Sequence, residues 1–144
     1  MTRYLTLGIM LTLGVIIGIT SSRLLDAQPA PFKLTNLFQA DLVGVNGMEV
    51  LVSVVEFSPR ATIGKHTHPG HEVAYVLEGS GVSEVEGHSP EVRKAGTVTY
   101  IPPKQVHESK NESATEPMKV LYVRIHPKGQ PVIDSRLTEP SFIK

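Results

Sequence analysis

The stretch at residues 63–81, IGKHTHPGHEVAYVLEGSG, is the most informative part of the sequence for predicting the fold. It combines a candidate metal-ligand pattern with the pattern of a β-hairpin. Three of the chain's six histidines fall within six positions, at 66, 68 and 71, and a glutamate follows at 72. Directly afterwards, VAYVLEG (73–79) and GVSEVEG (81–87) flank a Gly-Ser-Gly turn. Two such runs around a short glycine turn predict a β-hairpin. The sequence therefore places a crowd of imidazoles at the start of a pair of strands.

Further strands are predicted on both sides of this hairpin. MEVLVSVVEF (48–57) has valine at three alternate positions, and both GTVTYIPP (96–103) and MKVLYVRIHP (118–127) are rich in β-branched residues. Short strands with glycine and proline between them are typical of an all-β sandwich or barrel. No stretch after residue 30 has a convincing helical period. We therefore expect an all-β domain without internal repeats.

The composition of the 144 residues excludes several classes of protein. The length fits one domain. Two of the 14 Lys and Arg and one of the 14 Asp and Glu precede residue 28, which leaves 12 and 13 and a net charge near −1. This balance offers no basic surface for nucleic acid. The chain has no cysteine, which excludes a disulfide scaffold and thiolate metal ligation.

The N-terminal segment has the pattern of an export signal. Residues 4–22 carry no charge and lie between two arginines. This fits a secretory signal peptide cleaved after Ala27, although the run is long for a signal core and could equally be an uncleaved membrane anchor. A buried helix of the domain is a third alternative. The first two predict an exported protein, periplasmic or secreted, or one anchored in the membrane by residues 4–22.

These observations divide the chain into four segments. Residues 1–27 are expected to be the signal peptide or anchor. Residues 28–44 are expected to be a linker and leading segment, in which QPAPFKLT (28–35) has two prolines and little periodicity. The barrel is expected at 45–130 and a C-terminal tail at 131–144.

The histidine cluster predicts a metal site. His66 and His68 are two positions apart and would project from the same face of a strand. Pro69 and Gly70 permit a reversal that returns Glu72 to the same place, and His107 follows a strand that ends in proline. Three imidazoles and one carboxylate suit a divalent first-row metal. On an octahedral ion, such a set leaves two positions for water or substrate, unlike a closed structural zinc site.

Two motifs resemble those of single-domain bacterial cupins of the conserved-barrel type. The first, G-x5-H-x-H-x3/4-E-x6-G, matches from His66 to Gly79, with Arg60 in place of the initial glycine. The second, G-x5-P-x-G-x2-H-x3-N, matches from Gly96 to Asn111, with Lys104 in place of the middle glycine. The resemblance covers roughly residues 45–126.

The resemblance implies a small cupin (jelly-roll) β-barrel, here preceded by the N-terminal apolar helix or signal segment. It implies one divalent ion held by His66, His68, Glu72 and His107, with Fe, Mn, Ni and Zn as the alternatives. Since a side chain disfavours the positive φ that glycine permits, we expect residues 60 and 104 to avoid that conformation.

Several histidines and tyrosines are assigned no catalytic role. His71 is expected at the rim, because strand alternation turns it away from Glu72. His88 and His126 lie beside turn signals and are expected to be solvated. Tyr75 and Tyr100 are expected to pack.

Smaller residues are expected to shape the barrel. Gly79 and Gly96 are predicted turn residues, and Asn111 is predicted to hold a turn or to hydrogen-bond near the site. Ala74 and Val76 share the parity of Glu72 and are expected to line the pocket near the metal, which would make the site partly apolar.

The function expected from these residues is that of an exported metal-binding cupin. It could be a dioxygenase-like enzyme, or an isomerase or lyase, acting on a small enolic or phenolic substrate, with Glu72 as a ligand at rest and a catalytic base. The alternative is a non-catalytic module that binds a metal or a small ligand. Expected partners are a small molecule and possible homodimers, with no nucleic acid, and a membrane only through an uncleaved N-terminal segment.

Overall fold

The computed structural model describes residues 31–133 and 141–142. This part of the chain forms ten strands: β1 (Phe32–Asp41), β2 (Met48–Phe57), β3 (Ala61–His66), β4 (His71–Glu78), β5 (Ser80–Val85), β6 (Glu91–Lys94), β7 (Val98–Ile101), β8 (His107–Lys110), β9 (Met118–Pro127) and β10 (Ser141–Phe142). Within these residues, no helix has the length and hydrophobicity needed to span a membrane. The segment 1–27, expected to be a signal or anchor, lies outside the described residues.

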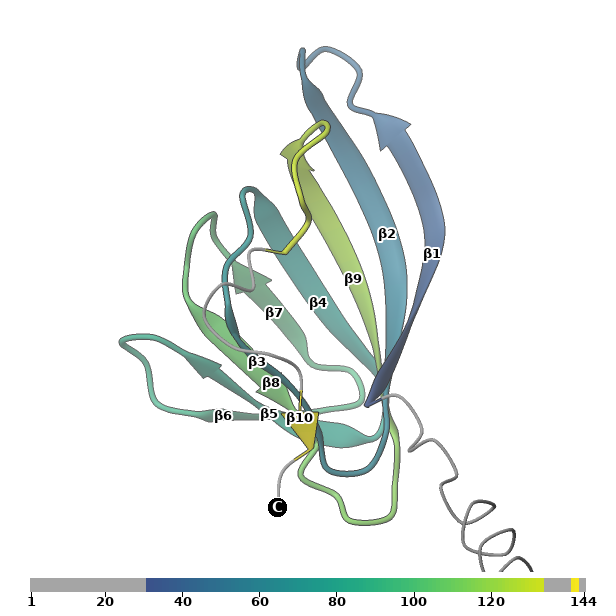
Figure 1. The fold of residues 1–144 in the computed structure, drawn as a ribbon, viewed down its shortest axis with the longest axis vertical. Helices are drawn as coiled ribbons and strands as arrows, with labels where there is room; N and C mark the ends of the chain where they lie inside the picture. The colour runs from purple at the N-terminus through teal and green to yellow at the C-terminus, as the bar shows by residue number, and fades with distance from the viewer. Residues whose placement is uncertain (1–30, 134–140, 143–144) are drawn as a thin grey trace, which may run out of the picture.

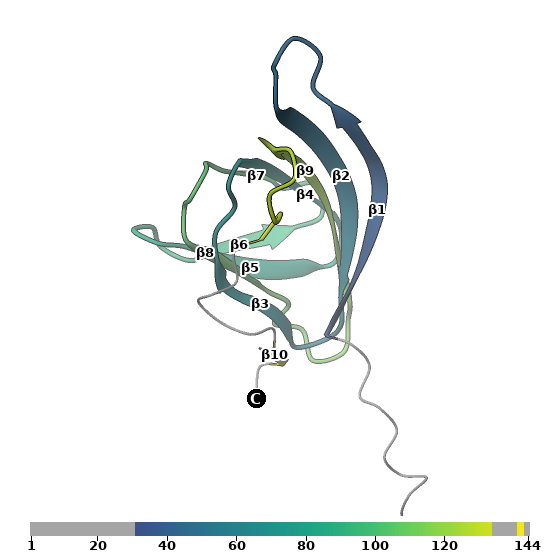
Figure 2. The same cartoon turned by 45° about the horizontal axis from the view of Figure 1, so that its top comes forward.

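The strands form two antiparallel sheets that face each other around a common interior (Figures 1 and 2). One sheet has the order β1-β2-β9-β4-β7 and the other β10-β3-β8-β5-β6. The chain passes from one sheet to the other between β2 and β3, between β3 and β4, and again after β4, so strands distant in sequence become neighbours. This confirms the predicted all-β barrel.

Side chains alternate strictly along the two central strands of the larger sheet. Residues 49, 51, 53, 55 and 57 of β2 are buried, whereas the valines at 50, 52 and 54 lie on the outer face and are half-buried. The ten residues of β9 alternate in the same way. β2 and β9 pair along their whole length, from Met48 opposite Pro127 to Phe57 opposite Met118. This register lines the barrel with two parallel rows of inward side chains.

One end of the interior is an apolar core. Its buried members are Val55, Phe57, Ala61, Ala74, Val76, Met118, Val120 and Tyr122. Phe57 is fully buried and lies opposite Met118, and Val55 lies opposite Val120. Burying an aromatic or branched side chain of this size contributes about 1.5–3 kcal/mol. Ala74 and Val76 do face inward, as their shared parity with Glu72 predicted, but they belong to this apolar core and not to the lining of the predicted metal site.

The opposite end of the same strands is polar. Along the inward rows, β2 carries Glu49 and Ser53, β4 carries Glu72, and β9 carries Arg124 and His126, all buried. A buried polar group is costly unless it is paired or hydrogen-bonded. The positions and partners of these side chains define the candidate site.

The prediction of a linker at 28–35 was wrong from Phe32 onward, because β1 starts at this residue. β1 pairs with β2 from Phe32 opposite Phe57 to Asp41 opposite Glu49. Little in the residue pattern marks this strand, because β1 is an edge strand. Eight of its ten residues are exposed, so it needs no alternation of apolar and polar residues.

The expectation for Arg60 and Lys104 was wrong. Both adopt the left-handed conformation, with φ of 64° and 63°. The Arg60 N–H donates to the Ser113 carbonyl at 2.9 Å, and the Lys104 N–H donates to the His68 carbonyl at 2.8 Å. The turns thus keep a geometry suited to glycine although a side chain is present, at a cost of about 1–2 kcal/mol each.

The predicted turn residues behave as expected. Gly79 and Gly96 have φ of 75° and 91°. Asn111 is fully buried, and its side-chain amide donates to the carbonyls of Ser58 at 3.1 Å and Glu116 at 2.8 Å. The Asn111 side chain therefore ties two loops together at the apolar end of the barrel.

Candidate metal centre

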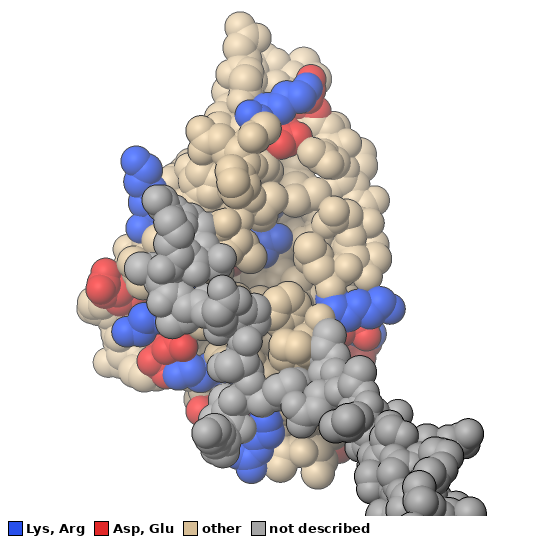
Figure 3. Space-filling view, viewed as in Figure 1, with Lys and Arg blue, Asp and Glu red and all other residues tan. Residues whose placement is uncertain are grey.

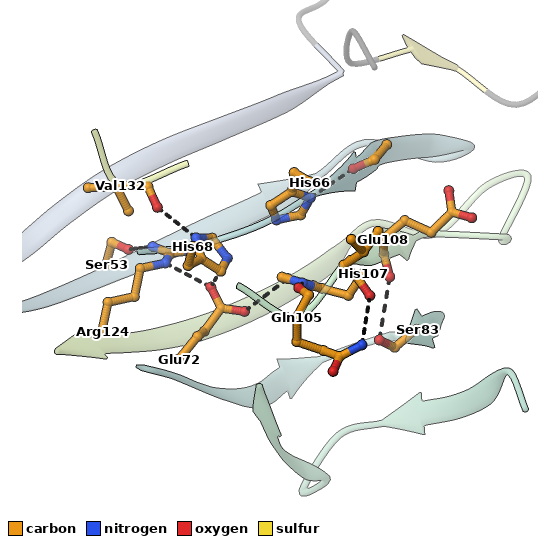
Figure 4. Close-up of polar contacts among 12 residues, drawn as sticks. Ser53, His66, His68, Glu72, Ser83, Gln105, His107, Glu108, Arg124 and Val132 are labelled. Carbon is orange, nitrogen blue, oxygen red and sulfur yellow. Dashed lines mark hydrogen bonds and ion pairs between the residues drawn. The ribbon is translucent and has the colours of Figure 1, made fainter. Parts of the chain in front are cut away.

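Three buried histidines converge at the polar end of the interior. His66 ends β3, His68 follows it by two residues, and His107 begins β8, where it lies opposite His66 in the smaller sheet. One ligand nitrogen from each ring can be chosen so that all three lie within 4.8 Å of one another. Figure 4 shows the rings arranged around a common point. The pairing of β3 with β8 therefore joins the two halves of the sequence pattern.

Backbone carbonyls fix the tautomer of every ring. In each histidine Nδ1 lies within hydrogen-bond distance of a main-chain oxygen. The oxygens belong to Gly64 at 2.7 Å from His66, Val132 at 2.7 Å from His68 and Gln105 at 3.0 Å from His107. Because a carbonyl only accepts, Nδ1 carries the hydrogen, and Nε2 of the neutral ring presents a lone pair. Such hydrogen bonds are the usual support of metal-ligating histidines.

Glu72, on β4, completes the group. Its Oε2 lies 2.9 Å from His68 Nε2, and its Oε1 lies 3.7 Å from His107 Nε2. His68 Nε2 is buried and has no hydrogen-bond partner among the described residues. A lone pair and a carboxylate oxygen this close repel each other unless a proton or a cation bridges them.

A divalent ion is the better bridge. Three neighbouring imidazoles disfavour one another's protonated forms. Metal–ligand distances of about 2.0–2.2 Å place two ligands of one ion about 3 Å apart, which matches the contact between His68 and Glu72. The residues present therefore fit a divalent metal.

Arg124, on β9, is a member of the site that sequence reasoning missed. Its Nε donates to Glu72 Oε2 at 2.7 Å, and its Nη1 donates to Ser53 Oγ at 3.0 Å. The guanidinium carbon lies 4.6 Å from the centre of the Tyr122 ring. Glu72 lies opposite Arg124 in the register of β4 and β9. The signal that could have found it is parity, because Arg124 continues the inward row of Val120 and Tyr122.

Burial and neighbouring charges set the protonation of the site. Burial, with His107 as the next largest cause, lowers the pKa of His66 from 6.5 to about 4. Burial alone would raise the pKa of Glu72, but hydrogen bonds from His107 and His68, which require a proton on Nε2 when no metal bridges the groups, and the charge of Arg124 hold that pKa well below its usual value. His66 is therefore neutral and Glu72 ionised near pH 7, which are the forms that bind metal.

The structure brings together all four predicted ligands and separates them from two of the other histidines. His71 is exposed, with its Nδ1 2.7 Å from the Tyr100 hydroxyl, and His88 is exposed as well, as predicted for both. Tyr75 and Tyr100 lie on the outer face, 40% and 55% exposed, where the Tyr100 ring stacks on His71, so neither packs in the interior. Strand alternation places both on the side opposite Glu72.

His126 was also predicted wrongly. It is only 3% exposed, because the inward row of β9 continues to this residue. The chain after β9 then turns back, and residues 128–132 form one wall of a pocket beside His126. The turn signal at Pro127 was correct, but it does not expose the preceding side chain.

Together, the two facing sheets and the buried histidine cluster define a small β-barrel protein with a candidate metal centre. A family model for the cupin domain matches residues 53–124, half of the chain, and the chain belongs to this family. The matched segment contains all four predicted ligands and Arg124.

Individual relatives support the fold. The chain is 28% identical over 109 residues to germin-like protein subfamily 3 member 1 of Arabidopsis thaliana, covering 72% of this chain and 52% of that protein. The structure of TT1209 from Thermus thermophilus is similar with a TM-score of 0.56 and 27% identity, over 74% of this chain and 92% of that one. The DMSP lyase DddQ from Ruegeria pomeroyi is similar with a TM-score of 0.54 and 19% identity, over 78% and 51%. The chain spans about half the length of the curated relatives it matches.

Proposed function

We propose that this chain binds one divalent metal ion through His66, His68 and His107, with Glu72 as the fourth ligand at rest. The observation that carries the proposal is the set of three fixed tautomers, which turn three buried lone pairs toward one point next to a carboxylate. Iron, manganese, nickel and zinc all suit imidazole with carboxylate.

The chemistry that suits this arrangement best is that of an isomerase or lyase acting on a small enolic or phenolic compound. A bound divalent ion supplies a Lewis acid that polarises an oxygen of the substrate. Glu72 is the residue placed to accept a proton, and Arg124 holds its carboxylate in position. Among the relatives above, the lyase supports this class of reaction by analogy of fold only.

Proton abstraction provides the test. The metal-loaded chain should speed the exchange of hydrogen for deuterium beside the carbonyl of 2-oxobutanoate, a small enolisable probe, as followed by proton NMR. Glu72→Gln should slow this exchange at least 100-fold, and metal content should be measured in the same samples. Oxygen uptake with catechol by the iron-loaded chain would instead favour a dioxygenase-like enzyme.

A non-catalytic binding module is the second candidate, and one observation favours it. The pKa of Glu72 is held well below its usual value, which makes its carboxylate a weak base near pH 7. A fully loaded chain that neither exchanges the probe's hydrogen nor consumes oxygen would support the binding module and contradict the enzyme.

The proposed cellular location of the protein is inferred from the sequence. We infer that residues 1–27 direct the barrel out of the cytoplasm, either as a signal peptide cleaved after Ala27 or as an anchor through residues 4–22. Cell fractionation with N-terminal sequencing separates these forms. An uncleaved chain in the cytoplasmic fraction would contradict both.

A further inference from the structure

A second cluster of polar side chains lies at the polar end of the barrel, next to the candidate metal centre. A pocket of about 610 Å³ opens between β1, β2 and the chain after β9. Its lining includes Gln39, Glu49, His126, Lys128 and Val132. Figure 3 shows this side of the molecule hollowed between the sheets, with basic and acidic side chains in small mixed groups. The pocket therefore has both the size for a small molecule and polar groups to orient one.

Two buried acceptors face each other in this pocket. His126 Nδ1 lies 3.1 Å from the Pro127 carbonyl, which fixes the hydrogen on Nδ1 and leaves a lone pair on Nε2 of the neutral ring. Nε2 lies 3.6 Å from Glu49 Oε1, beyond hydrogen-bond distance. It has no hydrogen-bond partner among the residues that the structure describes. Both residues are at least 95% buried, so an unmet acceptor here is costly.

The neighbouring side chains do not supply the donor that His126 Nε2 lacks. Gln39 donates to the other Glu49 oxygen, Oε2, at 2.7 Å. The Lys128 ammonium is held by Asp41, with contacts of 2.6 and 2.8 Å to its two carboxylate oxygens. His126 Nε2 therefore remains an unmet acceptor beside the negatively charged carboxylate of Glu49.

This geometry selects a chemical class. A single atom can satisfy both acceptors only if it carries at least two hydrogens, because each acceptor needs its own donor. A hydroxyl has one hydrogen, whereas a primary ammonium group has three. Water also has two, but a cation gains in addition a charge-assisted bond to the carboxylate.

The pocket shares one wall residue, Val132, with the support of the metal centre. Val132 lines the pocket, and its carbonyl accepts the hydrogen of the predicted ligand His68. His126 is two residues from Arg124 on the same face of β9, a separation of about 7 Å along the strand. We propose that the pocket of Glu49 and His126 binds the primary ammonium group of a small ligand whose acidic or enolic oxygen lies at the metal centre. The second half of this proposal rests on the proposed function.

Calorimetric titration of the full chain tests the pocket first without metal. Butylamine should bind at least tenfold more tightly than 1-butanol, which has a single donor. Glu49→Gln should abolish this preference, because it removes the charge while keeping the shape. Glu56→Gln, the same change at the exposed end of the same strand, should retain it. Equal binding of both probes, or an amine preference that survives Glu49→Gln, would overturn the proposal and indicate a closed ion pair between His126 and Glu49.

The metal-loaded chain tests the connection. 4-Aminobutanoate should bind at least tenfold more tightly than butanoate or 4-hydroxybutanoate, and more tightly than it binds the metal-free chain. An amine preference without any gain from the metal would overturn the joint site while the amine pocket stands. A chain that takes up no metal but still prefers butylamine would contradict the proposed function alone.

Discussion

The two ends of the barrel interior are built by the same strands but differ in chemistry. β2 passes from Glu49 at the polar end to Phe57 at the apolar end, and β9 returns from Met118 at the apolar end to His126 at the polar end. At the apolar end, contacts are non-directional and contribute mainly to stability. At the polar end, each buried group depends on a specific partner. The barrel thus separates the residues that hold the fold from those that carry the chemistry, and changes at the two ends should have different effects.

The largest loss of stability is expected from Phe57→Ala at the apolar end. Phe57 is fully buried, and truncating such a residue costs about 3–5 kcal/mol. Urea denaturation of the metal-free protein measures the free energy of unfolding. The neighbouring exposed Glu56→Ala should change it by less than about 0.5 kcal/mol.

Metal content sharpens this prediction. The Phe57→Ala chain that remains folded should bind as much metal per chain as the wild type. Loss of metal from the folded variant would show that the two ends are not separate.

Acid should weaken the polar end. The folded state holds the pKa of His66 at about 4, whereas the unfolded chain has the ordinary value of 6.5. Between these values the unfolded chain binds a proton that the folded chain does not, so stability falls as the pH falls. From pH 6.5 to 5, which lies above the titration of Glu72 in the folded state, the metal-free protein should lose about 1.5 kcal/mol.

Urea denaturation across this pH range measures the effect. His66→Asn should flatten the dependence, and His88→Asn, which changes an exposed histidine, should not. An equally steep fall in stability for His66→Asn would show that another group titrates.

A smaller gain is expected at the two strained turns. Arg60→Gly and Lys104→Gly should each stabilise the protein by about 0.5–1 kcal/mol, because glycine relieves the positive φ but adds freedom to the unfolded chain. Lys94→Gly, at an exposed position of β6 with ordinary φ, should destabilise it by about the same amount. Thermal unfolding compares the three variants. A loss of stability in both turn variants would mean that the Arg60 and Lys104 side chains offset the strain.

The sequence was informative where a pattern is local. His66, His68 and Glu72 lie within seven positions, and valine-rich runs marked β2 and β9. Arg124 was not predicted, because its partnership with Glu72 depends on the register of two strands more than 40 residues apart. β1 was not predicted, because the residues of an exposed edge strand need not alternate between apolar and polar.

The local sequence pattern also did not predict which residues at the ends of strands are buried. His126 follows the inward parity of β9, but its burial also depends on the chain that turns back after Pro127. The turns at Arg60 and Lys104 keep a geometry suited to glycine because hydrogen bonds from distant residues hold them. A single sequence does not reveal such hydrogen bonds.

Metal counted per chain in a matched pair of histidine variants tests the central claim most directly. His66 is a predicted ligand in the buried cluster, and His88 is an exposed histidine away from it. Elemental analysis after controlled loading should find close to one divalent ion per chain in the wild type and in His88→Ala, and less than a tenth of that in His66→Ala. Equal metal content in the two variants would contradict the account.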